Sequence, residues 1–328
     1  MLIRKYLYIM ATLLASTMSC SGSANKASSE QTAASESTTV TPGIKFNADS
    51  AYAFVQRQCD FGPRVPNTQA HRDCALYLES ELRRNGADVT VQKASLKAFD
   101  GTMLQSFNII GEFYPEKKER VLLLAHWDTR PWADRDEDES KHKEPVMGAN
   151  DGGSGVGVLL EMARLLRTNE PNVGIDILFL DSEDWGSYSV DDSWALGAQY
   201  WANNPHREGY VKPRYGILLD MVGDIDAVFS KEYFSSRYAG GIVDKVWATA
   251  QQLGYSRFVN REGGAITDDH LQINQMGIPC IDIIDMRENS STGFFPMWHT
   301  TGDTMERIDR TSLEAVGQTL TTLFLEKK

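Results

Sequence analysis

The sequence predicts an α/β fold, in which a mostly parallel central sheet forms the middle of a three-layer α/β/α sandwich. Three runs, VLLLA, IDILFL and YGILL, are apolar almost throughout, as expected of strands that are covered on both faces. Helical patterns alternate with these runs along the chain. Polar side chains follow the runs directly, and ligands of such sheets bind beyond the carboxyl ends of the strands. We therefore expect the functional site at that edge.

Each helix is predicted from its apolar periodicity. The predicted ranges are 47–58, 69–85, 154–166, 195–202, 241–253 and 312–326. The turn-rich segment FGPRVPNT separates the first two helices, and Gly86 ends the second. The segments ADVTVQKAS and SFNIIGEFY, which precede VLLLA, are predicted to be strands. We find no internal repeat and no second linker, so a single domain over residues 43–328 is expected.

Residues 1–19 are predicted to be a lipoprotein-type signal peptide. A basic start and a short apolar stretch, RKYLYIMATLL, lead to Cys20, which stands where a lipidated cysteine is expected. An ordinary cleaved signal or an uncleaved anchor is the alternative, because the preceding TMS departs from the usual lipobox. Residues 20–42 are rich in Ser, Ala and Thr and lack aromatics, which predicts a flexible tether. We expect an exported protein on the periplasmic side, lipid-anchored to a bacterial membrane.

The chain is acidic, with a formal net charge of −12. Residues 1–19 carry Arg4 and Lys5 and no acid, so their removal leaves −14. An acidic chain without a basic run argues against nucleic-acid binding. Carboxylates gathered around a cleft would instead attract cationic amine termini. We expect a monomer that contacts a membrane only through a lipid on Cys20.

Four cysteines are present, of which three remain if Cys20 carries lipid. Cys59 and Cys74 lie close in the sequence of an exported chain, so a disulfide between them is plausible, and the sequence leaves open whether they are bonded. Cys280 lies in the apolar run IPCIDII and is predicted to be a buried strand thiol. The sequence contains no CxxC, which argues against a metal site built from cysteines.

Carboxylates and imidazoles at the strand ends predict a zinc site, since zinc takes three or four N or O ligands in such sites. The candidates are His126 and Asp128 in HWD, Asp151 in NDGGSG, Glu183 and Asp184 in DSED, Asp220 in LLDMVG, and His299 in MWHTT. No HExxH occurs, so the ligands must come from separate loops. In the HxD pair, the aspartate can orient the imidazole through its second nitrogen.

Each candidate also has a structural interpretation. Asp151 could cap the helix that follows it, because aspartate is favoured there. Glu183 and Asp184 could form a solvated acidic turn, although two adjacent carboxylates repel each other and a cation compensates for that repulsion. His299 could pack against Trp298. In each case we favour the functional interpretation, because all of these residues follow strand-like runs or glycine-rich turns.

Six of these segments, in this order, resemble the core motifs of the zinc aminopeptidase-like family and, more closely, of its glutaminyl cyclase branch. The segments are HWDTR, NDGGSG, DSED, LLDMVGD, TDDH and FPMWHT. FGPRVPNT and SFNII also resemble family segments, and the similarity extends from about residue 61 to residue 309. The resemblance departs from the family at Ser182, where glycine is usual, and at Asp184, where animal cyclases have glutamate.

The resemblance implies a role for each matching residue. Asp151, Asp184 and His299 would bind one zinc ion per chain, and Glu183 would be the acid/base residue. Asp220 and Asp268 would form a hydrogen-bond network with Glu183. The residues that would contact substrate are Trp298 and Phe295, with Trp185 or Trp194 as a second pocket tryptophan and Trp132, in the insertion-like segment 130–145, as a further contact.

The activity that the resemblance implies is that of a glutaminyl-peptide cyclotransferase. Such an enzyme converts the N-terminal glutamine of peptides and proteins to pyroglutamate and releases ammonia, with zinc polarising the side-chain amide. The alternative is a zinc aminopeptidase, in which His126 and Asp220 hold a second zinc and Glu183 is the base for water attack. A non-catalytic binding module is a third hypothesis, disfavoured because the acid/base residue and the ligands are all retained.

Overall fold

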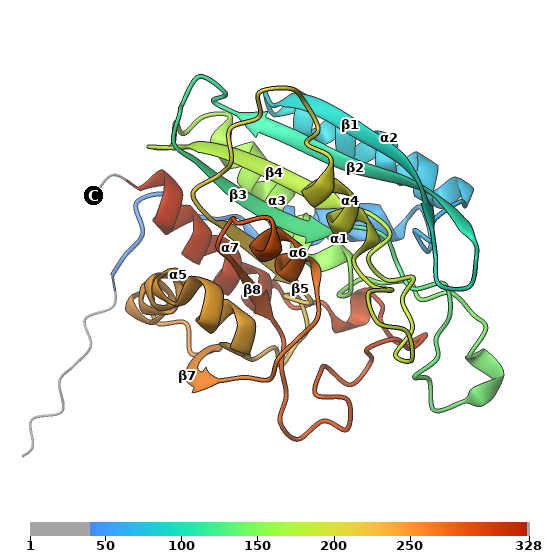
Figure 1. Ribbon diagram of the computed structural model, residues 1–328. Helices are drawn as coiled ribbons and strands as arrows, with labels where there is room; N and C mark the ends of the chain where they lie inside the picture. The colour runs from blue at the N-terminus through green and yellow to red at the C-terminus, as the bar shows by residue number, and fades with distance from the viewer. Residues whose placement is uncertain (1–39, 327–328) are drawn as a thin grey trace, which may run out of the picture. The chain divides into compact units, whose positions relative to one another are not determined.

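A six-stranded sheet runs through the part of the computed structural model that is described, residues 40–326 (Figure 1). The strand order is β1-β2-β4-β3-β5-β8. The strands are β1 (Asp88–Lys97), β2 (Met103–Phe113), β3 (Arg120–His126), β4 (Gly174–Leu180), β5 (Gly216–Asp220) and β8 (Cys280–Ile284). Strands β4, β3, β5 and β8 are parallel, whereas β1 and β2 add an antiparallel edge.

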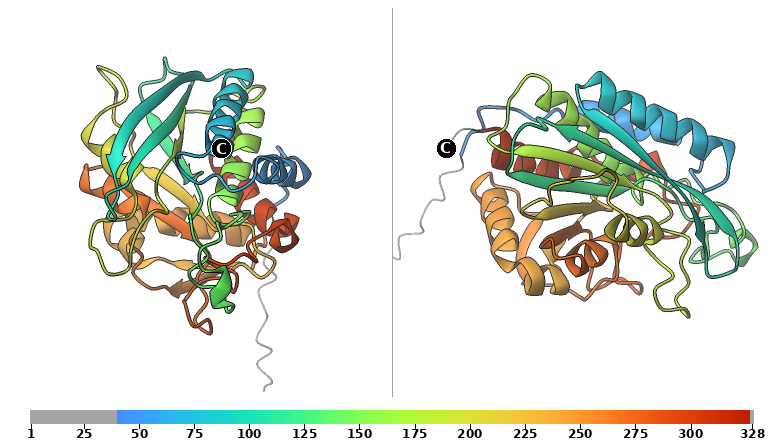
Figure 2. Two further views of the ribbon diagram at one scale, coloured as in Figure 1. Left: turned by 90° about the vertical axis from the view of Figure 1, so that its right-hand side faces the viewer. Right: turned by 45° about the horizontal axis from the view of Figure 1, so that its top comes forward.

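Helices cover both faces of this sheet, which confirms the predicted three-layer sandwich (Figures 1 and 2). The helices are α1 (Ala48–Cys59), α2 (Gln69–Arg84), α3 (Gly153–Leu166), α4 (Leu196–Asn203), α5 (Tyr233–Gln252), α6 (Asp269–Gln275) and α7 (Arg310–Leu325). Two 3₁₀ turns, η1 (Glu139–Lys141) and η2 (Met305–Arg307), and a small parallel pair, β6 (Phe229–Lys231) and β7 (Phe258–Glu262), complete the described residues.

Strand β3 shows how the two faces are divided. Val121, Leu123 and Ala125 belong to the larger core with α1, α3 and α7, while Leu122 and Leu124 face the smaller core with α4 and α6. Successive side chains of a strand point to opposite faces, so a strand buried on both faces must be apolar throughout. This is the physical reason for the continuous run VLLLA.

The predicted helices agree with the structure except near residue 241. Helix α5 begins at Tyr233 and not at Gly241, because Glu232 caps it through the N–H groups of Phe234 and Ser235. A kink at Ala239, with φ of −141°, interrupts the helical period just before two glycines. The short helix α6 was not predicted. Its seven residues are too few to show an amphipathic period.

The three cysteines among the described residues are all buried. Cys59 and Cys74 are buried free thiols, so the structure decides the question that the sequence left open. Both face the larger core, where a cysteine packs as a small apolar side chain. Cys280 is fully buried in β8, as predicted.

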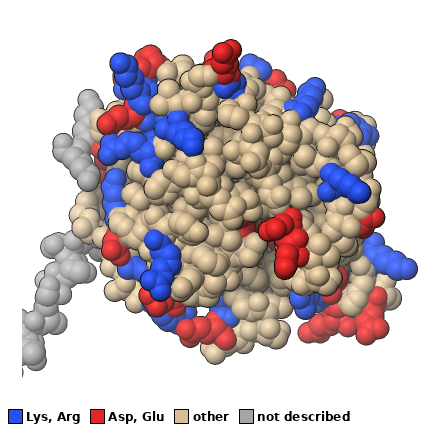
Figure 3. Space-filling model, in the orientation of Figure 1, with Lys and Arg blue, Asp and Glu red and all other residues tan. Residues whose placement is uncertain are grey.

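The signal peptide at 1–19, Cys20 and most of the tether at 20–42 lie outside the described residues. Among residues 40–326, no helix combines the length and the apolar character that a membrane span requires. On the face drawn in Figure 3, positive and negative side chains are interspersed around a largely uncharged centre.

Candidate active site

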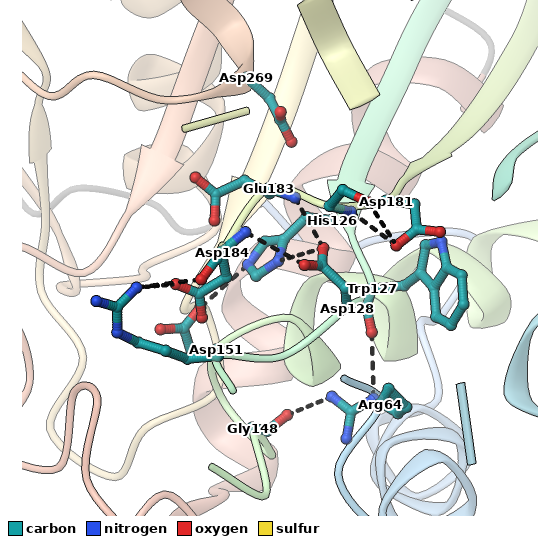
Figure 4. A network of polar contacts seen from close by, with 12 residues as sticks. Arg64, His126, Trp127, Asp128, Gly148, Asp151, Asp181, Glu183, Asp184 and Asp269 are labelled. Carbon is teal, nitrogen blue, oxygen red and sulfur yellow. Dashed lines mark hydrogen bonds and ion pairs between the residues drawn. The ribbon is translucent and has the colours of Figure 1, made fainter. Parts of the chain in front are cut away.

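The predicted metal donors and Glu183 meet at the carboxyl edge of the parallel strands, where Figure 4 shows His126, Asp151, Glu183 and Asp184 together. His126 ends β3, Asp220 ends β5, and Glu183 and Asp184 follow β4 after a two-residue turn. In the register of the sheet, His126 lies beside Leu180 on β4, and Asp220 lies beside Ile284 on β8. The strand ends are therefore level, and they direct polar side chains from distant parts of the sequence into one place.

Asp151, Asp184 and His299 form a compact group of metal donors, with one ligand atom from each lying within 4.8 Å of the others. His299 Nε2 lies 3.1 Å from Asp184 Oδ1 and 3.5 Å from Asp151 Oδ2. All three side chains are buried. Two carboxylates and one imidazole nitrogen are the donor types that zinc binds in catalytic sites.

The pKa shifts of these side chains favour the binding of a cation. Burial lowers the pKa of His299 well below its usual value, so the imidazole is neutral and has a lone pair to offer. Burial raises the pKa of Asp184 to about 7, against the opposing charge of Arg130. A bound cation favours the ionised carboxylate, so zinc would relieve the cost of burying Asp184.

A second group of donors shares Asp151 with the first. His126 Nε2 lies 3.1 Å from Asp151 Oδ1 and 3.2 Å from Asp220 Oδ1, and the three donors again lie within 4.8 Å. Burial opposes a charge on His126, but the nearby carboxylates of Asp128, Asp151 and Asp220 raise its pKa well above the usual value. The geometry alone therefore holds two adjacent three-donor groups.

Glu183 faces the cleft beside the first group. It is partly exposed and lies between the buried residues Ser182 and Asp184. Burial of its carboxyl raises its pKa well above the usual value, and the negative charges of Asp184, Asp268 and Asp269 raise it further against the charge of His126. A carboxyl with a raised pKa can accept a proton and return it near neutral pH.

Asp220 and Asp268 line the same cleft as Glu183. The hydrogen-bond network with Glu183 that the resemblance implies is not formed among the described residues, because Asp220 instead lies 3.2 Å from His126 Nε2 and Asp268 accepts the N–H of Asp269. Burial raises the pKa of both carboxyls, to about 7 for Asp220. Asp269 was quoted only as part of the TDDH motif, yet it is fully buried and neither of its carboxylate oxygens has a hydrogen-bond partner among the described residues. Burial raises the pKa of Asp269 well above its usual value, so a further carboxyl that favours its protonated form lies near Glu183 (Figure 4).

The turn that carries Asp151 is positioned by residues that the sequence did not reveal. The Asp303 carboxylate accepts the backbone N–H groups of Asn150 and Asp151 at 2.8 and 3.0 Å. Arg64 is fully buried and donates to the carbonyl oxygens of Met147 and Gly148. Helix α3 begins at Gly153 after Gly152 as its cap, so Asp151 is not the helix cap.

Three residues beside the donors adopt left-handed backbone conformations. Ser182, Met221 and His299 have φ of 59°, 49° and 56°. A non-glycine residue in this region costs about 1–3 kcal/mol and persists where the surroundings fix it, which is common at functional sites. The conformation of Ser182 explains why glycine is usual at this position of the family.

The cleft above the donors has a volume of about 960 Å³ and aromatic walls. Trp298 lines it and stacks on His299 with ring centroids 3.9 Å apart. Phe294 also lines it, whereas Phe295 is fully buried and packs behind Trp298. The prediction of Phe295 as a substrate contact is therefore wrong, because its ring points into the core and the preceding phenylalanine faces the cleft.

Of the other tryptophans proposed to contact substrate, one lines the cleft and two do not. Trp194 lines the cleft, which resolves the choice between Trp194 and Trp185. Trp132 and Trp185 pack edge to face, 5.6 Å apart, and do not line it. The insertion-like segment 130–145 begins with a buried Arg130, whose guanidinium lies 3.4 Å from Asp184 Oδ1. This segment thus contributes a cation to the site.

Several solved structures are similar to this chain in both sequence and fold. The crystal structure of Tannerella forsythia glutaminyl cyclase is 53% identical and superimposes with a TM-score of 0.84, covering 87% of this chain and all of that one. Bacteroides thetaiotaomicron glutaminyl cyclase, bound to N-acetylhistamine, is 51% identical over 87% of this chain and 99% of its own, with the same TM-score. A Zn-dependent exopeptidase from Parabacteroides distasonis is 54% identical, again with a TM-score of 0.84 and the same shares of the two chains.

Curated relatives are more distant. The bovine glutaminyl-peptide cyclotransferase is 25% identical over 80% of this chain and 78% of its own length. Aminopeptidase YwaD of Bacillus subtilis is 26% identical over 80% of this chain, which spans about half, 54%, of the YwaD length. Residues 108–324 match the model of peptidase family M28 and contain every predicted metal donor. The chain belongs to peptidase family M28.

Proposed function

We propose that this protein is a zinc-dependent glutaminyl-peptide cyclotransferase, which converts N-terminal glutamine to pyroglutamate and releases ammonia. The observation that carries the proposal is the position of Glu183, which lies beside the Asp151–Asp184–His299 donor group at the floor of an aromatic-walled cleft. The glutaminyl cyclases that are 51–53% identical over nearly their whole length support it.

The residues of the site can perform this reaction without activating water. In an N-terminal glutamine, the α-amine and the side-chain amide belong to one molecule, so holding that residue in a ring-like conformation brings the reacting atoms together. Asp151, Asp184 and His299 would hold the zinc ion, which would supply a Lewis acid for the amide carbonyl. Glu183 takes a proton from the α-amine and returns one to the departing nitrogen.

The surrounding residues support Glu183. Asp220 and Asp268 line the cleft with it, and nearby carboxyls that cannot all ionise cheaply hold a proton among them near neutral pH. The aromatic rings of Trp298, Phe294 and Trp194 exclude water from the bound side chain, which protects the amide from hydrolysis.

The function is tested with the purified soluble domain and a peptide that begins with glutamine. We expect the peptide to lose one ammonia with its chain intact, as measured by mass spectrometry and a coupled ammonia assay. The same peptide beginning with leucine serves as the control. Release of a free N-terminal residue from either peptide would identify an aminopeptidase, and no reaction of zinc-loaded protein with either peptide would favour a binding module.

We propose one zinc ion per chain, bound by the first donor group. The second group, His126, Asp151 and Asp220, is the specific observation that favours a two-zinc aminopeptidase instead. Metal analysis of purified protein decides between one and two equivalents. A stoichiometry of one that is unchanged in His126→Gln, and lost in His299→Gln, is the expected result.

We further propose that the protein acts on peptides and proteins with N-terminal glutamine outside the cytoplasm, as a monomer anchored through lipid on Cys20. This part of the proposal rests on the sequence alone. Metabolic labelling with radioactive palmitate tests it, since label is expected on the full-length protein and not on Cys20→Ser. Sedimentation of the soluble domain tests the monomer.

A further inference from the structure

The hydrogen-bond partner of His299 decides whether its ring can bind a metal. Its Nε2 faces Asp184 and Asp151, so this nitrogen offers the lone pair in the donor group. A neutral imidazole carries a single ring hydrogen, which must then lie on Nδ1. A group that accepts a hydrogen bond from Nδ1 therefore fixes the metal-binding tautomer.

Tyr188 is the residue placed to accept that hydrogen bond. Its hydroxyl oxygen lies 2.7 Å from His299 Nδ1. The nearest carboxylate oxygen to the same nitrogen belongs to Asp134 and lies 3.8 Å away, beyond hydrogen-bond reach. Both oxygens of Asp134 are engaged by Arg130, each at 2.7 Å. Asp134 is therefore engaged by Arg130, and the Tyr188 hydroxyl is the neutral oxygen within hydrogen-bond distance of His299 Nδ1.

The tyrosine is held in this position from two directions. Its ring packs against Trp194 and Trp298, with centroids 5.2 and 6.0 Å away, and the Arg135 guanidinium lies 4.4 Å from its centroid. The turn that carries it is closed by Ser193. The Ser193 hydroxyl accepts from the Ser187 N–H and donates to the carbonyl oxygens of Ser187 and Val190. Such support is what keeps a hydrogen-bonding group oriented.

We infer that Tyr188 is a positioning residue that accepts the Nδ1–H of His299 and thereby directs the Nε2 lone pair into the metal site. The inference deepens the proposed function and rests on its assignment of His299 as a zinc ligand. While the Tyr188 hydroxyl oxygen accepts the Nδ1–H of His299, the hydroxyl's own hydrogen is free to point into the cleft. Tyr188 lines this cleft and is 51% exposed. The Tyr188 side chain therefore contacts the metal ligand His299 and also forms part of the cleft wall.

The test is Tyr188→Phe, which keeps the ring packing and removes only the oxygen. The matched control is Tyr238→Phe, because Tyr238 on α5 is 52% exposed and lies outside the site. Zinc affinity of the metal-free proteins is measured by competition with a chromogenic chelator. Loss of a partner of a zinc-bound histidine weakens metal binding about 10–100-fold, so this loss is expected for Tyr188→Phe and none for the control.

The visible absorption spectrum of cobalt(II)-loaded protein gives a second readout, because it reports ligand geometry without any substrate. We expect the spectrum of Tyr188→Phe to differ from those of the wild type and the control. Ser193→Ala, which loosens the turn and leaves the tyrosine, should weaken zinc binding in the same direction by a smaller factor. Wild-type zinc affinity and an unchanged cobalt spectrum in Tyr188→Phe would overturn the inference.

The two proposals fail independently in these experiments. Zinc affinity is measured without peptide, so a protein that releases no ammonia from glutamine peptides can still show the Tyr188 effect. Conversely, normal ammonia release together with unchanged zinc affinity in Tyr188→Phe would leave the cyclase proposal standing and remove the positioning role.

Discussion

The Asp128 carboxylate accepts a hydrogen bond of 3.1 Å from the backbone N–H of Glu183. Its second oxygen accepts the N–H of Asp184 at 3.2 Å, so both oxygens are used (Figure 4). From the sequence, Asp128 was expected to orient the His126 ring, from which it lies 3.6 Å away. In the structure its hydrogen bonds hold the turn that carries the acid/base residue and a metal ligand.

Removing the Asp128 carboxylate should therefore reduce activity, although Asp128 itself does not contact the substrate. We expect Asp128→Ala to lower kcat/KM for a glutamine peptide by about 100-fold, since outer-shell partners at metal sites have effects of about 10–100-fold. Asp128→Asn retains one acceptor oxygen and should lose less. Asp60→Ala, at an exposed position after α1, is the control, and equal activity of Asp128→Ala and Asp60→Ala would refute the positioning role.

Glu183→Gln tests the division of labour between the adjacent carboxylates. The amide has nearly the same shape but cannot accept a proton, so kcat should fall by about 10²–10⁴-fold. Zinc content should stay at the wild-type value, because Asp184 and not Glu183 belongs to the donor group. Ammonia release and metal analysis on the same preparation measure both. Loss of zinc from this variant would show that Glu183 is a ligand instead.

Gly152 is required because the start of helix α3 lies close to the end of strand β3. Its φ is 87°, and a Cβ at this position would lie 2.3 Å from the Asp128 carbonyl oxygen and 3.1 Å from Cε1 of His126. Gly152→Ala should lower the free energy of unfolding by at least about 2 kcal/mol. Gly241→Ala in helix α5 meets no atom within 4 Å and should be neutral or slightly stabilising. Urea unfolding compares the two variants, and equal stability would contradict the steric argument.

Glu112, a buried carboxylate away from the site, forms an ion pair from which the pH dependence of stability can be predicted. Burial alone would raise the pKa of Glu112, but hydrogen bonds from His206 and Arg207 lower it to about 2 from the usual 4.5. A carboxyl whose pKa is lower in the folded state stabilises the fold above its unfolded pKa, and the stabilisation is lost as pH falls through the folded value. The affected window is thus about pH 4.5 down to about 2.

Glu112→Gln removes this contribution. Because Arg207 is partly exposed and screened by solvent, we expect the variant to be less stable than the wild type by about 2 kcal/mol at pH 7. The difference should shrink as pH approaches 2. Urea unfolding at pH 7, 4 and 3 measures it, and a difference that is independent of pH would show that the pair acts through packing and not through charge.

Much of the site could be predicted because its residues are tied to strand ends. Each apolar run stops where the sheet stops, so the polar residue that follows, such as His126 or Asp220, must lie at the edge. The contributions of Asp303 and Tyr188 could not be predicted in this way. Asp303 acts through two hydrogen bonds and Tyr188 through one, in each case to residues more than a hundred positions away, and no local pattern marks such pairs.

By itself, the sequence determined the layer architecture, the strands whose ends carry the site, and the candidate donors, because periodicity and strand ends are local properties of the chain. Only the tertiary structure decided which donors share a metal position, that Phe294 and not Phe295 faces the cleft, and that Cys59 and Cys74 stay apart as free thiols. These outcomes depend on the direction of side chains across packed elements, which is set by sheet register and backbone conformation at residues such as His299.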